Sequence, residues 1–200
     1  MSAPEEEFYS EERWENWLQR LREEDLDPED EDSARLLLNL QDDVAIAVAK
    51  ILRALHDERI DAEEAMDELA DIHETVSGEP DLAEEKAMLV GGVQMSLDVV
   101  FYAAQQYVAE GVAKEATIRE YVEAAVEAER EEDLERAVGL VSAAGTRVIA
   151  AQNDELQDEF EMAVVEDLDP GYVTEWANGL DSLREALADP EVVEEEDEGE

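Results

Sequence analysis

The stretch AMLVGGVQMSLDVVFYAAQQYVA, residues 87–109, decides the fold, because it is the least polar part of a highly charged chain. Asp98 is its single formal charge, whereas 36% of the 200 residues are charged. Its larger apolar residues recur every three or four positions, at Leu89, Val93, Leu97, Val100, Ala104 and Tyr107. This spacing is one face of an α-helix, and smaller residues line a second face. We therefore expect a central helix that other helices surround.

This helix is long enough to cross a bilayer, but its composition argues against a membrane span. Asp98 lies in the middle of the segment, where a carboxylate costs several kcal/mol in lipid. Gly91 and Gly92 each cost about 1 kcal/mol of helix propensity, and close approach of another helix would compensate. We expect a soluble protein with no membrane contact.

A narrow polar seam, formed by Gln94, Asp98 and Gln105, follows the same helix and is the candidate polar binding site. If the seam faces water, Asp98 needs no partner. If the helix is buried on all sides, Asp98 must be hydrogen-bonded, for example to an Arg or Tyr of a neighbouring helix or of a second copy. The large aromatic residues Phe101 and Tyr102 beside it favour the buried alternative.

The charge is extreme: 59 Asp and Glu against 14 Lys and Arg give a net charge of −45. An acidic protein of this kind could bind basic partners or mimic nucleic acid. The acids are spread along the whole chain, Lys is scarce, and Cys is absent, which favours adaptation to molar salt. In molar salt the repulsion between surface charges is almost fully screened, since the Debye length is about 3 Å at 1 M. Under that interpretation the acidity carries no information about function.

The remaining chain predicts an all-α fold of seven or eight helices in a single domain over residues 10–189. An acidic mobile leader, residues 1–9, precedes it, and a disordered acidic tail, residues 190–200, follows it. A weaker helix is expected over residues 153–167. Gly145 is expected to be a helix–helix packing glycine. Helix starts are expected at capping residues, namely Ser10, Asp27-Pro28, Asp61 with Glu64, Asp81, Thr117 with Glu120, and Asp169-Pro170, and Gly111 is expected to end the central helix.

Trp14 and Trp17 lie on one face of the first predicted helix. Two interpretations are open. The helix packs on the main core, or it is an anchor that inserts into a protein partner, since Trp is enriched at interface hot spots. The pair is therefore a possible interface.

Three segments resemble an uncharacterised haloarchaeal family, the domain of unknown function 2150. They are DPEDEDSARLLLNLQDDVAIA (27–47), AAGTRVI (143–149) and EWANGLDSL (175–183). The similarity covers nearly the whole chain and implies a salt-adapted archaeal protein. It implies no activity and no functional residue.

Catalytic and metal-binding motifs do not match. His73-Glu74 is followed by Ser77 where a zinc-binding HExxH motif needs its second His, and no Ser sits in a G-x-S-x-G elbow. Scattered cations supply no basic stripe for nucleic acid. The acidic helix Asp61–Val76 is similar to the magnesium-binding helices of all-α nucleotide pyrophosphohydrolases, but such spacings recur by chance in so acidic a chain. We expect no catalytic residue, no metal ligand and no cofactor.

The sequence favours a cytoplasmic, non-enzymatic helical protein, since no signal peptide is evident. It would act through a protein partner or through self-association, as an interaction or regulatory module or a homo-oligomeric unit. One alternative is a magnesium-dependent pyrophosphohydrolase-like enzyme that uses helix carboxylates. Another is a helical bundle that binds a small ligand at the polar seam.

Overall fold

The computed structural model describes residues 7–27, 29–151 and 168–188, and the described residues form only helices and connecting turns. The fold is all-α, as predicted. The predicted helix over 153–167 and the predicted tail over 190–200 lie outside the described residues. The helices are α1 (Glu11–Glu23), α2 (Glu31–His56), α3 (Ala62–Ser77), α4 (Glu84–Glu110), α5 (Ile118–Arg130), α6 (Leu134–Ala151) and α8 (Tyr172–Ala188).

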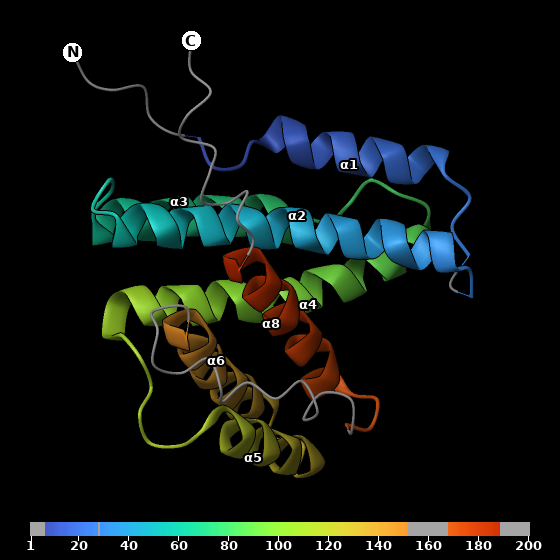
Figure 1. Ribbon diagram of the computed structural model, residues 1–200. Helices are drawn as coiled ribbons and strands as arrows, with labels where there is room; N and C mark the ends of the chain where they lie inside the picture. Colours follow the sequence, from blue (N-terminus) through green and yellow to red (C-terminus); the bar gives the residue numbers. More distant parts are fainter. Residues whose placement is uncertain (1–6, 28, 152–167, 189–200) are drawn as a thin grey trace, which may run out of the picture.

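Helix α4 is the centre of the molecule, as its apolar sequence predicts. It packs against α2 and α3 on one side and against α6 and α8 on the other. Figure 1 shows α1 lying over the α2–α3 pair, with α5 packed outside α6. By length and composition α4 is the one described helix that could cross a membrane, and half of its most apolar stretch is buried inside the molecule.

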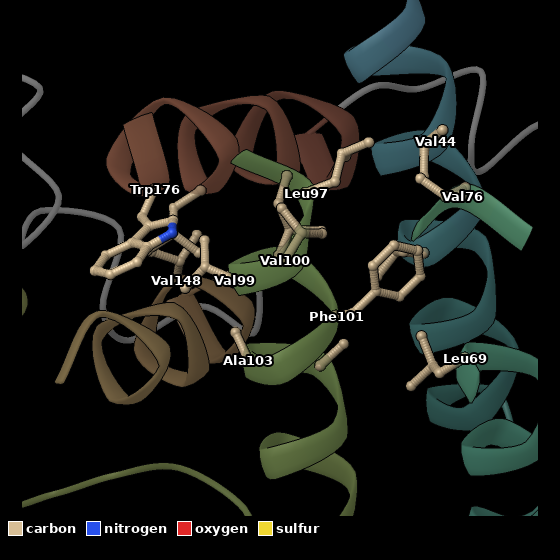
Figure 2. Close-up of a cluster of buried hydrophobic side chains, with 14 of the residues drawn as sticks. Val44, Leu69, Val76, Leu97, Val99, Val100, Phe101, Ala103, Val148 and Trp176 are labelled. Atoms are coloured by element: carbon tan, nitrogen blue, oxygen red, sulfur yellow. The ribbon is translucent and has the colours of Figure 1, made fainter. Parts of the chain in front are cut away.

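The core continues on both sides of α4. Phe101, which is fully buried, points toward Val44 of α2 and toward Leu69 and Val76 of α3. On the opposite side, Val99 and Ala103 lie beside Val148 of α6 and Trp176 of α8 (Figure 2). Removing these apolar surfaces from water is the main contribution to the stability of the fold.

Two glycines permit the closest helix crossings. A Cβ atom at Gly179 of α8 would lie 2.0 Å from the backbone oxygen of Ser96 in α4, and a Cβ at Gly145 of α6 would lie 2.4 Å from Cβ of Ala103. Gly145 is thus a packing glycine, as predicted. At Gly91 and Gly92, by contrast, no neighbouring described residue lies within 4 Å of an added Cβ, so no described helix of the chain itself makes the expected close approach there.

Local capping signals place most helix ends correctly. Ser10 accepts a hydrogen bond from the Arg13 N–H, both predicted capping boxes form, and Gly111 ends α4 with a φ of 81°. Three predicted starts are wrong. Helix α8 begins at Tyr172, two residues after Pro170, and the Tyr172 N–H donates to Glu129 of α5. Helix α2 begins at Glu31 with Asp30 as its cap, because Asp27 instead accepts from the Glu29 N–H in a turn. Helix α4 begins after Ala83, and the carbonyl of Asp81 instead accepts from Arg22 of α1.

The packed chain begins before the predicted boundary at residue 10. Phe8 and Tyr9 are each only 8% exposed and belong to the core, so the predicted mobile leader over residues 1–9 extends too far. Burial raises the pKa of the Tyr9 hydroxyl, and the nearby Asp43 carboxylate raises it further. Burial of the Phe8 and Tyr9 rings stabilises this segment against the core, although the acidic composition of the segment predicts a mobile leader.

Besides the hydrogen bond from Arg22 to Asp81, two polar contacts join α1 to the rest of the molecule. The Lys86 ammonium of α4 donates to the carbonyl oxygens of Leu21, Arg22 and Glu24 at 2.9, 2.9 and 2.6 Å. A cation at this position also interacts favourably with the negative end of the α1 dipole. The second contact is the Asp43 carboxylate of α2, which accepts from side chains of α1.

Candidate functional site on the outer face of helix α4

One side of α4 is only partly covered by the described residues. Its members follow helical spacing along the side opposite Val93 and Val100, and four of the six are glycine or methionine. We call them the outer face: Met88, Gly91, Gly92, Met95, Asp98 and Tyr102. Met88 is 73% exposed and Tyr102 is 42% exposed, while the other four are partly buried. Asp98 is the single formal charge on this face.

Asp98 pairs with a histidine. Its Oδ1 lies 2.9 Å from Nε2 of His73 in α3, and since a carboxylate can only accept, Nε2 carries the hydrogen. The His73 ring stacks on Phe101, with centroids 4.6 Å apart and planes 11° apart, and meets the edge of Tyr102. The side chain of Asp98 is 39% exposed and that of His73 is 19% exposed. The partner is therefore neither the Arg nor the Tyr that the sequence suggested, and the pair lies at the border between core and solvent.

Gln94 also serves the α3–α4 contact. Its amide nitrogen donates to the carbonyl oxygens of Val76 and Gly78 at 2.7 and 2.8 Å, where α3 ends and its last carbonyls lack helical partners. Gln105 is half-buried further along α4. The structure thus brings Gln94 and Asp98 together in joining α3 to α4, and this use of their polar atoms weakens the case for a ligand-binding seam.

The acids of α3 mostly face solvent. Glu63, Glu64, Asp67 and Asp71 are exposed, and Glu64 accepts from the Asp61 N–H in the capping box. A cleft of about 550 Å³ between α3 and the N-terminal segment collects Glu68, Asp71 and Glu74 with two further glutamates. Even so, no described group of three or more Asp, Glu or His side chains is placed to hold a metal ion. A magnesium-dependent site needs such convergence.

Trp14 and Trp17 both contact the chain itself. Trp14 is 5% exposed and belongs to the core. The Trp17 indole N–H donates to Asp43 Oδ2 at 2.8 Å, and Nε of Arg13 donates to the same oxygen at 2.9 Å. In this conformation neither indole is presented to a partner.

The family model that matches the chain is described as an uncharacterized protein conserved in archaea (DUF2150), and it covers residues 7–196. The chain belongs to this archaeal family. The match confirms the family resemblance of the three segments quoted above. No curated protein and no solved structure matches the chain.

For this DUF2150 protein, the sequence predicts the low charge of the outer face of α4 but not its exposure to solvent. The low charge of residues 87–109 is a sequence property, but it predicts burial just as well as exposure. His73 gave no signal, because its partner lies 25 residues away on another helix. Helical spacing drawn for both helices could have placed His73 and Asp98 on facing sides.

Proposed function

We propose that this protein is a non-enzymatic module of a salt-rich archaeal cytoplasm that acts by binding protein, and that the outer face of α4 is its contact surface. The observation that carries the proposal is the exposure of this face. A chain with a net charge of −45 leaves Met88 and Tyr102 in solvent on a helix that has one charge between Lys86 and Glu110.

The contrast with α3 supports a specific role for this face. The exposed side of α3 carries carboxylates at Glu63, Glu64, Asp67, Asp71 and Glu74. Carboxylates keep a surface hydrated, whereas methionine, glycine and tyrosine are suited to contact with another protein. Met and Tyr are enriched in interface cores, and charged residues are depleted there. Burying an exposed Met side chain contributes roughly 1.5–3 kcal/mol.

The proposed salt adaptation points to the same kind of recognition. In molar salt the Debye length is about 3 Å, so the acids neither steer a partner nor repel one over distance. Recognition then depends on shape and on burial of apolar surface, which salting-out ions strengthen. On this chain the outer face of α4 offers a helical shape and exposed apolar surface.

Affinity purification at native salt tests the proposal. Tagged wild-type chain, Met88→Glu and a matched control, Leu38→Glu, are each used to capture proteins from archaeal cells in molar KCl. Leu38 is 52% exposed on α2, so the control adds the same charge at another exposed apolar position. We expect the wild type and Leu38→Glu to retain a bound protein, and a second copy of the chain counts as one. Met88→Glu should lose that protein. Identical retention by all three would contradict the assignment of this face.

A further inference from the structure

We propose that the partner at the outer face of α4 is a second copy of this chain, and that two α4 helices pair antiparallel across Gly91 and Gly92. This inference deepens the proposed function and rests on it. It is carried by the open space beside the glycines, by the symmetry of the sequence around them, and by the charge of the molecule.

The space beside Gly91 and Gly92 is open, unlike the space beside the glycines at the close helix crossings of α6 and α8 with α4. At Gly145 and Gly179 an added Cβ would clash with a neighbouring helix, whereas at Gly91 and Gly92 nothing described lies within 4 Å. Two adjacent helical glycines each cost about 1 kcal/mol of helix propensity. A helix of a second copy that crosses at this point would gain close backbone approach, as small residues allow.

On the outer face, the residues around the glycines have two-fold symmetry. Residues 88–95 read MLVGGVQM, so Met88 and Met95 lie at equal distances on either side of the Gly91–Gly92 bond. A two-fold interface uses the same patch on both copies. With the axis at this bond, Met88 of each copy meets Met95 of the other, and Gly91 meets Gly92.

Charge explains why a second copy fits here. Two chains with a net charge of −45 each can approach only where carboxylates do not oppose each other. No charge lies between Lys86 and Asp98, so the centre of the crossing is neutral on both copies. Helices that cross at about 50° diverge away from the centre, which separates Glu84 and Glu85 from Asp98 of the other copy.

The contact is expected to need salt. The repulsion between two strongly acidic chains is long-ranged in dilute buffer and is screened to about 3 Å at 1 M. The crossing between Met88 and Met95 spans only about two helical turns, so the dimer should be weak and should form only at high chain concentration.

Sedimentation velocity in molar KCl, over a wide range of chain concentration, tests the pairing. We expect the mass to rise to that of two chains. Gly91→Gln should abolish the rise because its side chain fills the crossing point, whereas Gly139→Gln should preserve it. Gly139 is a matched control, since it is also a helical glycine with nothing within 4 Å of an added Cβ. A one-chain mass at every concentration, or a dimer indifferent to Gly91→Gln, would overturn the pairing.

Disulfide trapping tests the antiparallel arrangement, which is practical because the chain has no Cys. Oxidation of an equal mixture of Met88→Cys and Met95→Cys chains should give a covalent dimer of unlike chains. Each variant alone should cross-link poorly, because like positions are about 10 Å apart along the axis, beyond the reach of a disulfide. Efficient cross-linking of either variant with itself would overturn the antiparallel pairing.

The two proposals fail separately. If the chain is monomeric in molar KCl but Met88→Glu loses a captured protein of another kind, the pairing is wrong and the interaction module stands. If the wild type captures nothing and remains monomeric, both are wrong.

Discussion

At the scale of single residues, the Asp98–His73 pair is a contact between α3 and α4 at the edge of the core. Because Asp98 is 39% exposed, solvent screens the pair, and the contribution of such pairs to stability is small. Asp98→Ala should lower the free energy of unfolding by about 0.5–1 kcal/mol, through the lost hydrogen bond to His73. Asp98→Asn should lose less, because its amide oxygen can still accept from Nε2.

Chemical unfolding in molar KCl measures both variants against the wild type. A loss of 3 kcal/mol or more for Asp98→Ala would show that the carboxylate is essential to the α3–α4 contact, as full burial would require.

Asp42 of α2 provides a pH-dependent prediction. Its Oδ1 is buried and has no hydrogen-bond partner among the described residues. Burial raises the pKa of this carboxyl, Ser182 offsets part of the increase, and the Asp181 charge adds to it. The folded chain therefore holds this proton more tightly than the unfolded chain, so stability falls as pH rises from the ordinary aspartate value, about 4, through the raised one.

Asp42→Asn removes this cost. At neutral pH it should increase the free energy of unfolding, by up to about 1 kcal/mol, and the gain should shrink as the pH falls through the raised pKa toward about 4. Unfolding midpoints measured across this pH range in molar KCl test it. A variant that is less stable than the wild type at neutral pH would contradict it.

At the scale of helices, glycines of identical chemistry have opposite roles. Gly179→Ala places a Cβ 2.0 Å from the Ser96 carbonyl oxygen, so α8 must move away from α4. Overpacking of this kind typically costs about 1–3 kcal/mol. Gly139→Ala meets nothing and should instead gain about 0.5–1 kcal/mol from helix propensity. Thermal unfolding of the two variants should shift in opposite directions, and equal shifts would contradict the close crossing of α4 and α8.

The same contrast shows what can be predicted from the sequence. Ser10, Asp61 and Thr117 were placed correctly, because a cap and its helix are neighbours in the chain. Asp27, Asp81 and Asp169 were misplaced as caps. The carbonyl of Asp81 is taken by Arg22, which lies 59 residues away. The candidate site depends on such distant contacts: propensity gives every helical glycine the same cost, and only the packed helices distinguish Gly145 from Gly91.

At the scale of the whole molecule, the charge should make folding depend on salt. Fifty-nine acids against 14 cations repel one another in the compact state, and dilute buffer does not screen them. The described ion pairs lie mostly at exposed positions, such as Arg130–Glu127 and Arg136–Glu131, and pairs of this kind contribute little. The apolar core around α4 must therefore outweigh the repulsion, and molar KCl should be needed for it to do so.

Circular dichroism from molar KCl down to about 0.1 M, where the Debye length is about 10 Å, should show loss of helix or a large fall in melting temperature. Potassium sulfate at equal ionic strength should stabilise at least as well as KCl, since it screens equally and also strengthens apolar burial. A melting temperature that does not change with salt would overturn the proposed adaptation, and the acidity would then call for a basic partner instead.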